Sequence, residues 1–403
     1  GEAPAAGIRV TDDGIGMTCA QGSSRSCGAT GPGGGSCAGT EACEAANCTW
    51  TGVCELSAVE SCNGTDDDCD GLTDEGFGCV LGTSTPCTTS CGVSAARSCD
   101  AGCVLGPCSV AEVACNGCDD DEDGLTDEGA WCPVAGLPTT QDLFAVWGSS
   151  AGDVWVVGNA GTILRWNGSA WASVSGGGTR VLRGVFAASP TAAWAVGDAA
   201  AILAWDGSAW SPESAGVTGV LRDVWGVSAG EVWAVGDGGR ILRRTSGAWS
   251  TASSGTTQDL PGAWGSGAAN IWAVGGHKTH SRWNGTSWTV GTLSDGNFDA
   301  YGVGGVSATD VWAIGSGGST RHWAGATWAT VTSGVSVALH GLYAASASQA
   351  WAVGDSGTIR RWNGSTWSAT TSGTTRTLYG VWGAAAAEVW AVGAAGTILR
   401  GSW

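Results

Sequence analysis

A repeat of about 39 residues runs from Leu143 to the end of the chain and restricts the folds available to it. Equivalent positions recur at intervals of 39, 39, 39, 40, 39 and 39 residues, at Leu143, Leu182, Leu221, Leu260, Ala300, Leu339 and Leu378. A period near 40 residues, punctuated by Trp and Gly, is typical of propellers and other arrays in which each unit packs on the next.

Each repeat predicts four short strands. In the third unit they are residues 221–227, 231–237, 240–244 and 248–254, where apolar residues alternate with small or polar ones. Asn-Gly and Asp-Gly pairs predict tight hairpins between the third and fourth strands, at Asn167, Asp206, Asn284 and Asn363. Four strands make one blade, so the seven units predict an all-β fold, a seven-bladed β-propeller.

The seventh unit is incomplete, because the chain ends 26 residues after that unit begins at Leu378. Its missing fourth strand has a counterpart upstream: residues 129–143 resemble residues 246–260, and Trp131 falls near the place of Trp249. We therefore expect the strand near 130–136 to pair beside residues 397–400, so that the propeller spans residues 129–403. Closure of the ring would remove exposed strand edges. An eighth, partial blade is the alternative.

The first third of the chain has a different composition. All 17 Cys lie between Cys19 and Cys132, and residues 1–136 hold 22 acidic and 3 basic residues, whereas the rest holds 14 of each. Cysteine at this density is typical of disulfide-rich proteins outside the cytosol, and a start at Gly1 fits a processed secreted form. The acidic composition argues against nucleic-acid binding. No apolar run reaches the roughly 18–20 residues that span a bilayer.

This region contains an internal duplication. CNGTDDDCDGLTDEG at residues 62–76 returns as CNGCDDDEDGLTDEG at 115–129, an offset of 53 residues. We expect an N-terminal extension over 1–18 and two Cys-rich modules, 19–78 and 79–132. If Cys79 is counted as the last Cys of the first copy and Cys132 as that of the second, each copy has eight Cys, with 105 possible pairings, and Cys19 is left over as a free thiol or an intermolecular bridge.

The two acidic segments predict metal sites. Alternate carboxylates followed by a Gly can wrap around a hard cation such as Ca²⁺, which takes six to eight oxygen ligands. They differ from an EF-hand loop, since Phe77 and Ala130 stand where the final Glu belongs. We expect about two Ca²⁺ ions per chain, one for each loop. The candidate ligands are Asp66, Asp68, Asp70, Asp74, Glu75, Asp119, Asp121, Asp123, Asp127 and Glu128. A solvated acidic turn that aids solubility is the alternative.

The motif C-N-G-x-D-D-D-C-D-G-x-x-D-E resembles the MopE-type metal-binding repeat of secreted myxobacterial proteins. The second copy departs from it, since Glu122 replaces the inner Cys and Cys118 lies further forward. The resemblance implies a metal, but the loops lack the His and Met that copper favours. Residues 137–403 are similar to short Trp-rich propellers of myxobacterial secreted proteins, a resemblance that implies a fold and no activity.

Most of the 25 Trp residues occupy repeated positions and are expected in the cores between blades rather than in sugar-binding platforms. The first set is Trp155, Trp233, Trp272, Trp312, Trp351 and Trp390, and the second is Trp171, Trp210, Trp249, Trp288, Trp328 and Trp367. A basic column is expected to lie along the blade faces or to pair with strand neighbours. It consists of Arg165, Arg243, Arg282, His322, Arg361 and Arg400.

One column of the first strands does not repeat, although its neighbours are nearly constant. It mixes aromatic, cationic and Pro residues: Phe144, Arg183, Arg222, Pro261, Tyr301, His340 and Tyr379. These residues are expected at the channel mouth, on the face where the turns between second and third strands also emerge with His277 and Lys278. We interpret all of them except Pro261 as a candidate binding face. The alternatives are a solvated mouth without sequence constraint and, at His277–His280, a tolerated loop variant.

No catalytic constellation is apparent, so the sequence predicts a secreted or cell-surface, non-catalytic binding or scaffold protein with a protein or glycan partner at the propeller face. A subunit of an extracellular filament or coat is one alternative, with self-assembly through Cys19 or the segment Ile8–Val10. A multivalent lectin is another, and a hydrolase is the third.

Overall fold

The computed structural model describes residues 24–30, 36–42, 55–56, 61–64, 72–74, 76–89, 92–108, 115, 119, 127, 129–293, 298–385 and 388–403, with backbone alone before residue 61. The chain divides into two compact units. One comprises residues 1–113 and 118–125, and the other residues 114–117 and 126–403. Each is described by itself.

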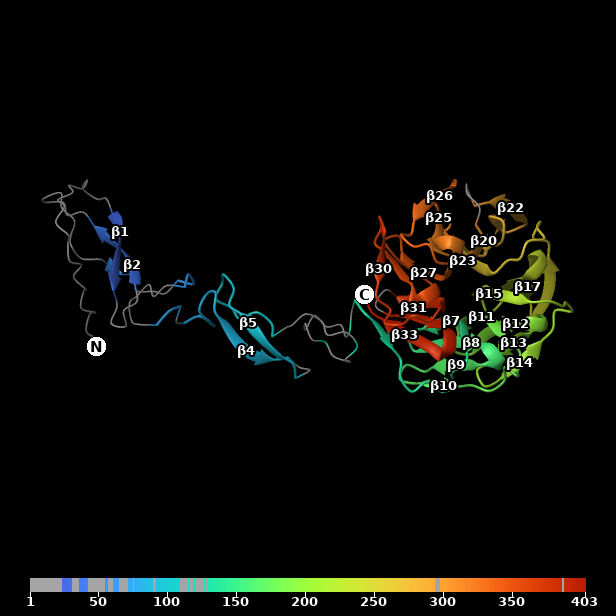
Figure 1. Ribbon diagram of the computed structural model, residues 1–403, viewed down its shortest axis with the longest axis horizontal. Coiled ribbons are helices and arrows are strands. Elements are labelled where there is room, and N and C mark those ends of the chain that lie inside the picture. Colours follow the sequence, from blue (N-terminus) through green and yellow to red (C-terminus); the bar gives the residue numbers. More distant parts are fainter. Residues whose placement is uncertain are drawn as a thin grey trace. The chain divides into compact units, whose positions relative to one another are not determined.

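Seven four-stranded antiparallel sheets form the second unit and are arranged as blades around a central channel (Figure 1). The prediction of a seven-bladed propeller is confirmed. The first four sheets are β7 (Leu143–Ser150), β8 (Asp153–Gly158), β9 (Ile163–Trp166) and β10 (Trp171–Ser173); β11 (Leu182–Ser189), β12 (Ala192–Gly197), β13 (Ile202–Trp205) and β14 (Trp210–Glu213); β15 (Leu221–Ser228), β16 (Glu231–Gly236), β17 (Arg240–Thr245) and β18 (Ala248–Ala252); β19 (Gly262–Gly267), β20 (Asn270–Val274), β21 (Thr279–Trp283) and β22 (Trp288–Thr292). The last three are β23 (Ala300–Ser307), β24 (Asp310–Gly315), β25 (Ser319–Trp323) and β26 (Trp328–Thr332); β27 (Leu339–Ser346), β28 (Gln349–Gly354), β29 (Ile359–Trp362) and β30 (Trp367–Thr370); β31 (Leu378–Ala385), β32 (Glu388–Gly393), β33 (Thr397–Gly401) and β6 (Trp131–Pro133).

The second strand of each sheet lies between two neighbouring sheets and is therefore apolar on both faces. In β16, Val232, Trp233 and Val235 are all fully buried. The first set of Trp residues is confirmed as core, because every member is at most 2% exposed. Of the second set, Trp210, Trp328 and Trp367 are buried, and Trp171, Trp249 and Trp288 are half-buried.

The ring closes where β31 packs beside β7 (Figure 1). The last sheet takes its outermost strand from the segment before the first repeat, since β6 pairs antiparallel with β33. In this register Trp131 lies opposite Gly401 and Cys132 opposite Arg400. Trp131 is 3% exposed and packs in the core that also contacts Trp403. The two ends of the propeller sequence are thus joined in one blade.

Two kinds of turn recur. Six three-residue turns follow the second strands: η1 (Asn159–Gly161), η2 (Asp198–Ala200), η3 (Asp237–Gly239), η4 (Ser316–Gly318), η5 (Asp355–Gly357) and η6 (Ala394–Gly396). The expected hairpins between third and fourth strands are present, with four-residue loops, as in the pairing of Trp166 with Trp171. The Asn167 side chain closes this loop by accepting the backbone N–H groups of Ser169 and Ala170 at 3.0 and 2.9 Å.

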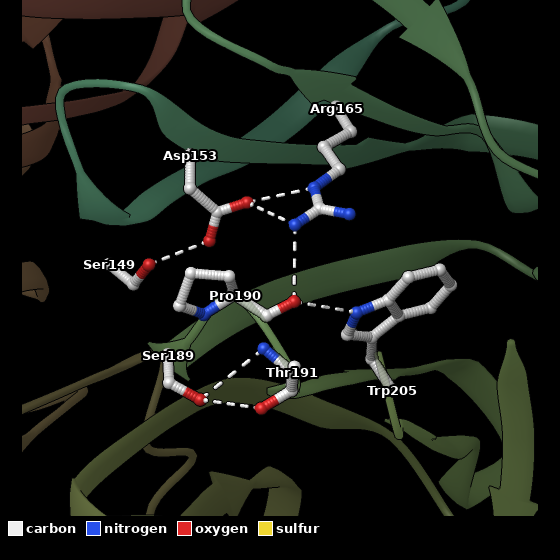
Figure 2. Close-up of polar contacts among 7 residues, drawn as sticks. All are labelled: Ser149, Asp153, Arg165, Ser189, Pro190, Thr191 and Trp205. Carbon is white, nitrogen blue, oxygen red and sulfur yellow. Dashed lines mark hydrogen bonds and ion pairs between the residues drawn. The ribbon is translucent and has the colours of Figure 1, made fainter. Parts of the chain in front are cut away.

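Polar groups join neighbouring sheets at the end of the channel opposite the η turns. Figure 2 shows Arg165 donating to Asp153 at 2.8 Å and to the Pro190 carbonyl of the next sheet at 3.1 Å. Trp205 Nε1 donates to the same carbonyl at 3.1 Å. The Arg165 guanidinium also lies over the rings of Trp155 and Trp205, with centroid distances of 4.7 and 5.5 Å. The expectation that the basic column pairs with strand neighbours is confirmed here and at Arg243, His322 and Arg400.

The described part of the first unit forms one three-stranded sheet and one hairpin. The sheet is formed by β1 (Ser24–Thr30), β2 (Ser36–Ala42) and β3 (Glu55–Leu56), and the hairpin by β4 (Ser84–Thr88) and β5 (Ser94–Ser98). Among the residues that the structure describes in this unit, three disulfides are formed: Cys62–Cys103, Cys79–Cys99 and Cys87–Cys108. Within the part of the chain that the structure describes, no helix has the length and hydrophobicity to cross a membrane.

Candidate functional site at the channel mouth

The irregular column of the first strands lines a single cavity at the centre of the ring. Its members are Phe144, Arg183, Arg222, Pro261, Tyr301, His340 and Tyr379, and each is half-buried. The η turns lie at the same end, because the backbone N–H of Asp198 donates to the Val181 carbonyl, next to the start of β11. The structure therefore brings together six of the eight predicted binding-face residues, with Pro261 as the seventh member of the ring.

Four of these side chains form a continuous aromatic arc over four sheets. The ring centroids of Tyr301 and His340 are 5.6 Å apart, those of His340 and Tyr379 5.7 Å, and those of Tyr379 and Phe144 5.3 Å. The arc ends at Arg183, whose guanidinium lies 5.8 Å from the Phe144 ring centroid. The arc thus already accepts one cation from within the protein.

The basic residues of the column are neutralised within their own sheets. Arg183 donates to both oxygens of Asp198, at 2.6 and 3.2 Å. Arg222 pairs with Asp237 of the next turn and, at 3.5 Å, with Asp259. These cations are therefore less available to a ligand than the sequence suggests.

His340 follows the same rule, with Nε2 2.9 Å from Asp355 Oδ1. In all three sheets the acid follows the base by fifteen residues and begins the η turn. Where the column holds Phe, Tyr or Pro, the residue fifteen positions later is uncharged: Asn159, Gly276, Ser316 or Ala394. The fifteen-residue spacing between base and acid is visible in the sequence and would have predicted these pairs.

Carboxylates also surround the tyrosines of the arc. Burial, followed by the charges of Asp299 and Asp355, raises the pKa of Tyr301. Burial, followed by the charges of Asp142 and Asp355, raises the pKa of Tyr379. Both phenols are therefore neutral, and the aromatic side of the mouth has a negative potential.

Asp223 is a lining residue that the sequence analysis missed. It stands one residue after Arg222 in β15, at a position occupied in the other six sheets by Gly or Ala: Ala145, Gly184, Gly262, Gly302, Gly341 and Gly380. Its carboxylate accepts the backbone N–H groups of Val224 at 2.8 Å and of Ala263, in the next sheet, at 2.9 Å. Burial raises the pKa of Asp223 to about 7, against the lowering effect of these two donors.

Large aromatic side chains also line this cavity. Trp147 packs against the cores on both sides of its own sheet and against the cores between the second and third and the third and fourth sheets. A single side chain can reach all four only if it extends across the channel. Its ring lies 5.6 Å from that of Phe186 and 6.4 Å from that of Trp382. The cavity is therefore a cup with an aromatic floor.

The irregular turn of the fourth sheet divides between the mouth and the core. His277 is exposed, lines an adjoining cavity with Arg222 and Tyr301, and has Nδ1 2.7 Å from Gln258 Oε1. Lys278 lines neither of these two cavities. His280 packs on Trp272, with ring centroids 5.2 Å apart. Burial, and then the nearby Arg282, lowers the pKa of His280 to about 4, so this half-buried imidazole is neutral at pH 7.

Of the ten predicted metal ligands, the structure describes Asp74, Asp119 and Asp127, and the other seven lie outside the described residues. Asp74 is 2% exposed and holds its loop together. Its carboxylate accepts backbone N–H groups from Leu81 at 2.7 Å, Asn63 at 3.0 Å and Gly64 at 3.1 Å. Burial acts to raise the pKa of Asp74, but the donors from Leu81, Asn63 and Gly64 together hold it below its usual value. Asp74 and Asp127 also share a left-handed backbone, with φ of 52° and 53°.

The disulfides show how the two copies of the Cys-rich repeat are connected. Cys62 and Cys79, which flank the first acidic loop, are bonded to Cys103 and Cys99 of the following copy. Their equivalents in the second copy, Cys115 and Cys132, are bonded to each other. No third copy follows the second loop, so that loop closes on itself.

The fold and the lined mouth define a seven-bladed β-propeller with a chemically varied cup at one end of its channel. No protein-family model and no curated protein sequence matches the chain. Among solved structures, it is similar to "YCF48 bound to D1 peptide" (TM-score 0.59, 19% identity, 69% of this chain and 97% of that chain). It is also similar to YCF48 from Cyanidioschyzon merolae (TM-score 0.56, 20% identity, 68% and 99%) and to the WD40 β-propeller domain of Doa1 (TM-score 0.58, 14% identity, 67% and 94%). At these identities the likeness shows the fold alone.

Proposed function

We propose that the protein is a non-catalytic binding or scaffold protein, and that its propeller recognises a polypeptide at the channel mouth. One observation carries the proposal. The residues of the irregular first-strand column all line one cup, whereas the columns beside it are nearly constant, with Asp223 as an exception that lines the same cup. In a symmetric ring, a structural position favours the same residue type in every blade, so a varied position is free to specialise for a ligand.

The comparisons support a peptide as the ligand class. One similar propeller was solved as "YCF48 bound to D1 peptide". A glycan stacked on the aromatic arc is a second candidate, because sugars pack on aromatic faces and the arc offers four rings in series.

The Cys-rich unit supports an extracellular or cell-surface location in this proposal. All eight Cys whose side chains the structure describes are in disulfides. Such bonds persist in oxidising compartments. We further propose that the two acidic loops bind Ca²⁺ and stabilise this unit. Cys19 and Ile8–Val10, on which self-assembly into a filament or coat would depend, lie outside the described residues.

Selection from a random peptide display library, with the full chain as bait, tests the mouth. The comparison variant replaces four lining residues by Ala: Arg183, Arg222, Tyr301 and Tyr379. We expect selected peptides to bind the wild type and to lose at least about tenfold in affinity on the variant, as for interface anchors. Circular dichroism confirms that the variant is folded. Selected peptides that bind both proteins equally would show that the mouth is not the site.

A further inference from the structure

The channel cup contains a carboxylate that the protein leaves without a cationic partner. None of the ion pairs among the described residues includes Asp223, although every basic member of the mouth column has an acid beside it. The two groups that donate hydrogen bonds to the Asp223 carboxylate are the backbone N–H groups of Val224 and Ala263, which carry no net charge. A half-buried carboxylate is costly unless a charge or several donors balance it.

The surroundings of the cup add to this negative charge. Two arginines line the mouth. More carboxylates than this pair with the lining side chains or act on them through their charge: Asp142, Asp198, Asp237, Asp259, Asp299 and Asp355. An anionic ligand would have to displace Asp198 from Arg183, or Asp237 from Arg222. A cationic ligand would meet no such competition.

The aromatic arc favours the same charge. Tyr and Phe faces attract ammonium and guanidinium groups within about 6 Å of the ring centroid. Arg183 already lies over Phe144 in this way, while Tyr301 and Tyr379 line the cup without such a partner among the contacts of the described residues. The arc therefore favours a cationic over an anionic ligand in this cavity.

We propose that the cup accepts a basic side chain, Arg or Lys, of the partner polypeptide, with its charged group at Asp223 and its stem along the aromatic arc. This inference rests on the proposed function and specifies its ligand. The long aliphatic stem of either residue suits an aromatic wall, and the charged end suits a carboxylate in the lining of the same cavity. Binding would neutralise the Asp223 carboxylate, as the basic residues of the mouth already neutralise Asp198, Asp237 and Asp355.

Three matched short peptides test the proposal with the full chain. The probes are acetyl-Gly-Arg-Gly-amide, its Lys counterpart and the same peptide with citrulline, which is neutral and nearly the same shape as Arg. Ligand-observed NMR at pH 8 should show the basic peptides bound and the citrulline peptide at least about tenfold weaker, because a charged hydrogen bond is lost. Equal binding of Arg and citrulline peptides, or no binding of either basic peptide, would overturn the proposal.

Two variants of Asp223 assign the charge to this residue. Asp223→Gly introduces the residue found in five other sheets, and Asp223→Asn keeps the shape of the side chain. Both should weaken the basic peptides at least about tenfold and leave the citrulline peptide unchanged. Should neither variant fold, replacement of Tyr301 and Tyr379 by Ala is expected to cause a similar loss. Undiminished binding of the Arg peptide in a folded variant would contradict the assignment.

Display selection separates this inference from the function on which it rests. Peptides that need the four mouth residues, and that carry Arg or Lys whose replacement abolishes binding, support both. Peptides that need the mouth but contain no basic residue, and that bind Asp223→Gly as tightly as the wild type, support the proposed function and overturn the inference. Neutral sugars that bind independently of Asp223 would likewise overturn it.

Discussion

Arg244 and Glu213 form an ion pair 2.7 Å long between the third and second sheets. Arg244 stands where most sheets have a third-strand Trp, such as Trp205, and its guanidinium lies 5.1 Å from the ring of Trp194. In the second sheet, Ala204 replaces the Arg that covers this Trp elsewhere. The cation over the buried Trp is therefore retained, but it comes from the opposite side of the interface.

This pair predicts a non-additive effect on stability. Arg244→Ala leaves Glu213, which also accepts from Trp249 Nε1 at 2.6 Å, as a partly buried charge without its partner. We expect each single variant, Arg244→Ala and Glu213→Ala, to lower the free energy of unfolding by about 1–3 kcal/mol. The double variant should lose no more stability than the less stable single variant, because it removes both charges and leaves neither without a partner.

Arg400→Ala is the matched control for that cycle, since Arg400 also pairs across strands but its side chain is 52% exposed. Its cost should stay at about 0–1 kcal/mol, as for exposed pairs. Urea denaturation of the wild type and the four variants measures each of these free-energy changes. Additive losses at Arg244 and Glu213 would show that the pair does not act as a unit.

Closure of the ring depends on Trp131, the buried Trp of the strand that precedes the first repeat. Trp131→Ala should lower the free energy of unfolding by about 3–5 kcal/mol, the usual cost of removing a buried Trp. It should also loosen β6 and expose the edge of β33, which favours association between chains. Urea denaturation and size-exclusion chromatography measure the two effects. Trp171→Ala, at the equivalent place within a continuous blade, should destabilise without association. A monomeric Trp131 variant with unchanged stability would contradict this role.

The propeller could be predicted from the sequence because each blade repeats the same physical requirements. Gly236, for example, ends a second strand where a Cβ atom would lie 2.2 Å from the Val220 carbonyl oxygen. Every blade needs this close approach, so the Gly recurs and marks the period. Strand order and ring closure then follow from the repeat and from the missing fourth strand of the last unit.

The sequence predicted where the candidate site lies, but it did not predict which charged groups of the site are paired and which are not. The irregular column predicted the position of the mouth. The strand pattern alone, however, did not reveal that Arg222 is paired with Asp237, fifteen residues later. Asp223 could not be predicted from the variable column, because it lies in the nearly constant column beside it, where the other sheets have Gly or Ala. Disulfides could not be predicted, because equivalence between copies does not identify partners: Cys62 bonds to Cys103 in the other copy.

Asp223 predicts that stability falls as pH rises toward neutrality. Its folded pKa of about 7 exceeds the ordinary value of 3.8, so the folded state binds more protons between these values. The stabilisation from this excess is complete below pH 3.8 and is lost as pH rises through about 7. The wild type should therefore lose stability relative to Asp223→Asn between pH 4 and pH 8. Thermal melts of both proteins over this range measure the difference.

Other groups line the same cup and can titrate or carry charge: Arg183, Arg222, Tyr301, His340 and Tyr379. His340→Gln is therefore included as a control in the same melts. The stability difference between wild type and Asp223→Asn should persist in that background. A difference that does not change with pH would show that Asp223 has no such proton linkage.

If the acidic loops bind Ca²⁺, their acidic residues should fall into two classes: those that bind the metal and those, such as Asp74, that hold the backbone of the loop. Elemental analysis should find about two Ca²⁺ ions per chain, one for each loop. Chelation should increase hydrogen exchange in residues 61–108, since a ligand that binds the folded state stabilises it. A candidate metal ligand such as Asp68 should behave differently from Asp74, whose carboxylate holds backbone N–H groups of Leu81 and Asn63.

Asp68→Asn should abolish the response of the first loop to Ca²⁺ and leave exchange in the chelated protein unchanged. Asp74→Asn should instead increase exchange both with and without Ca²⁺, because its backbone contacts do not need the ion. The lowered pKa of Asp74 adds an acid dependence: its contribution to stability is present above pH 3.8 and is lost as pH falls through the folded value. Asp127→Asn, the equivalent change in the second copy, should leave the first loop unaffected. If the protein contains no bound Ca²⁺ and its hydrogen exchange does not respond to chelation, the metal sites are refuted. The structural role of Asp74 would still be tested separately by Asp74→Asn.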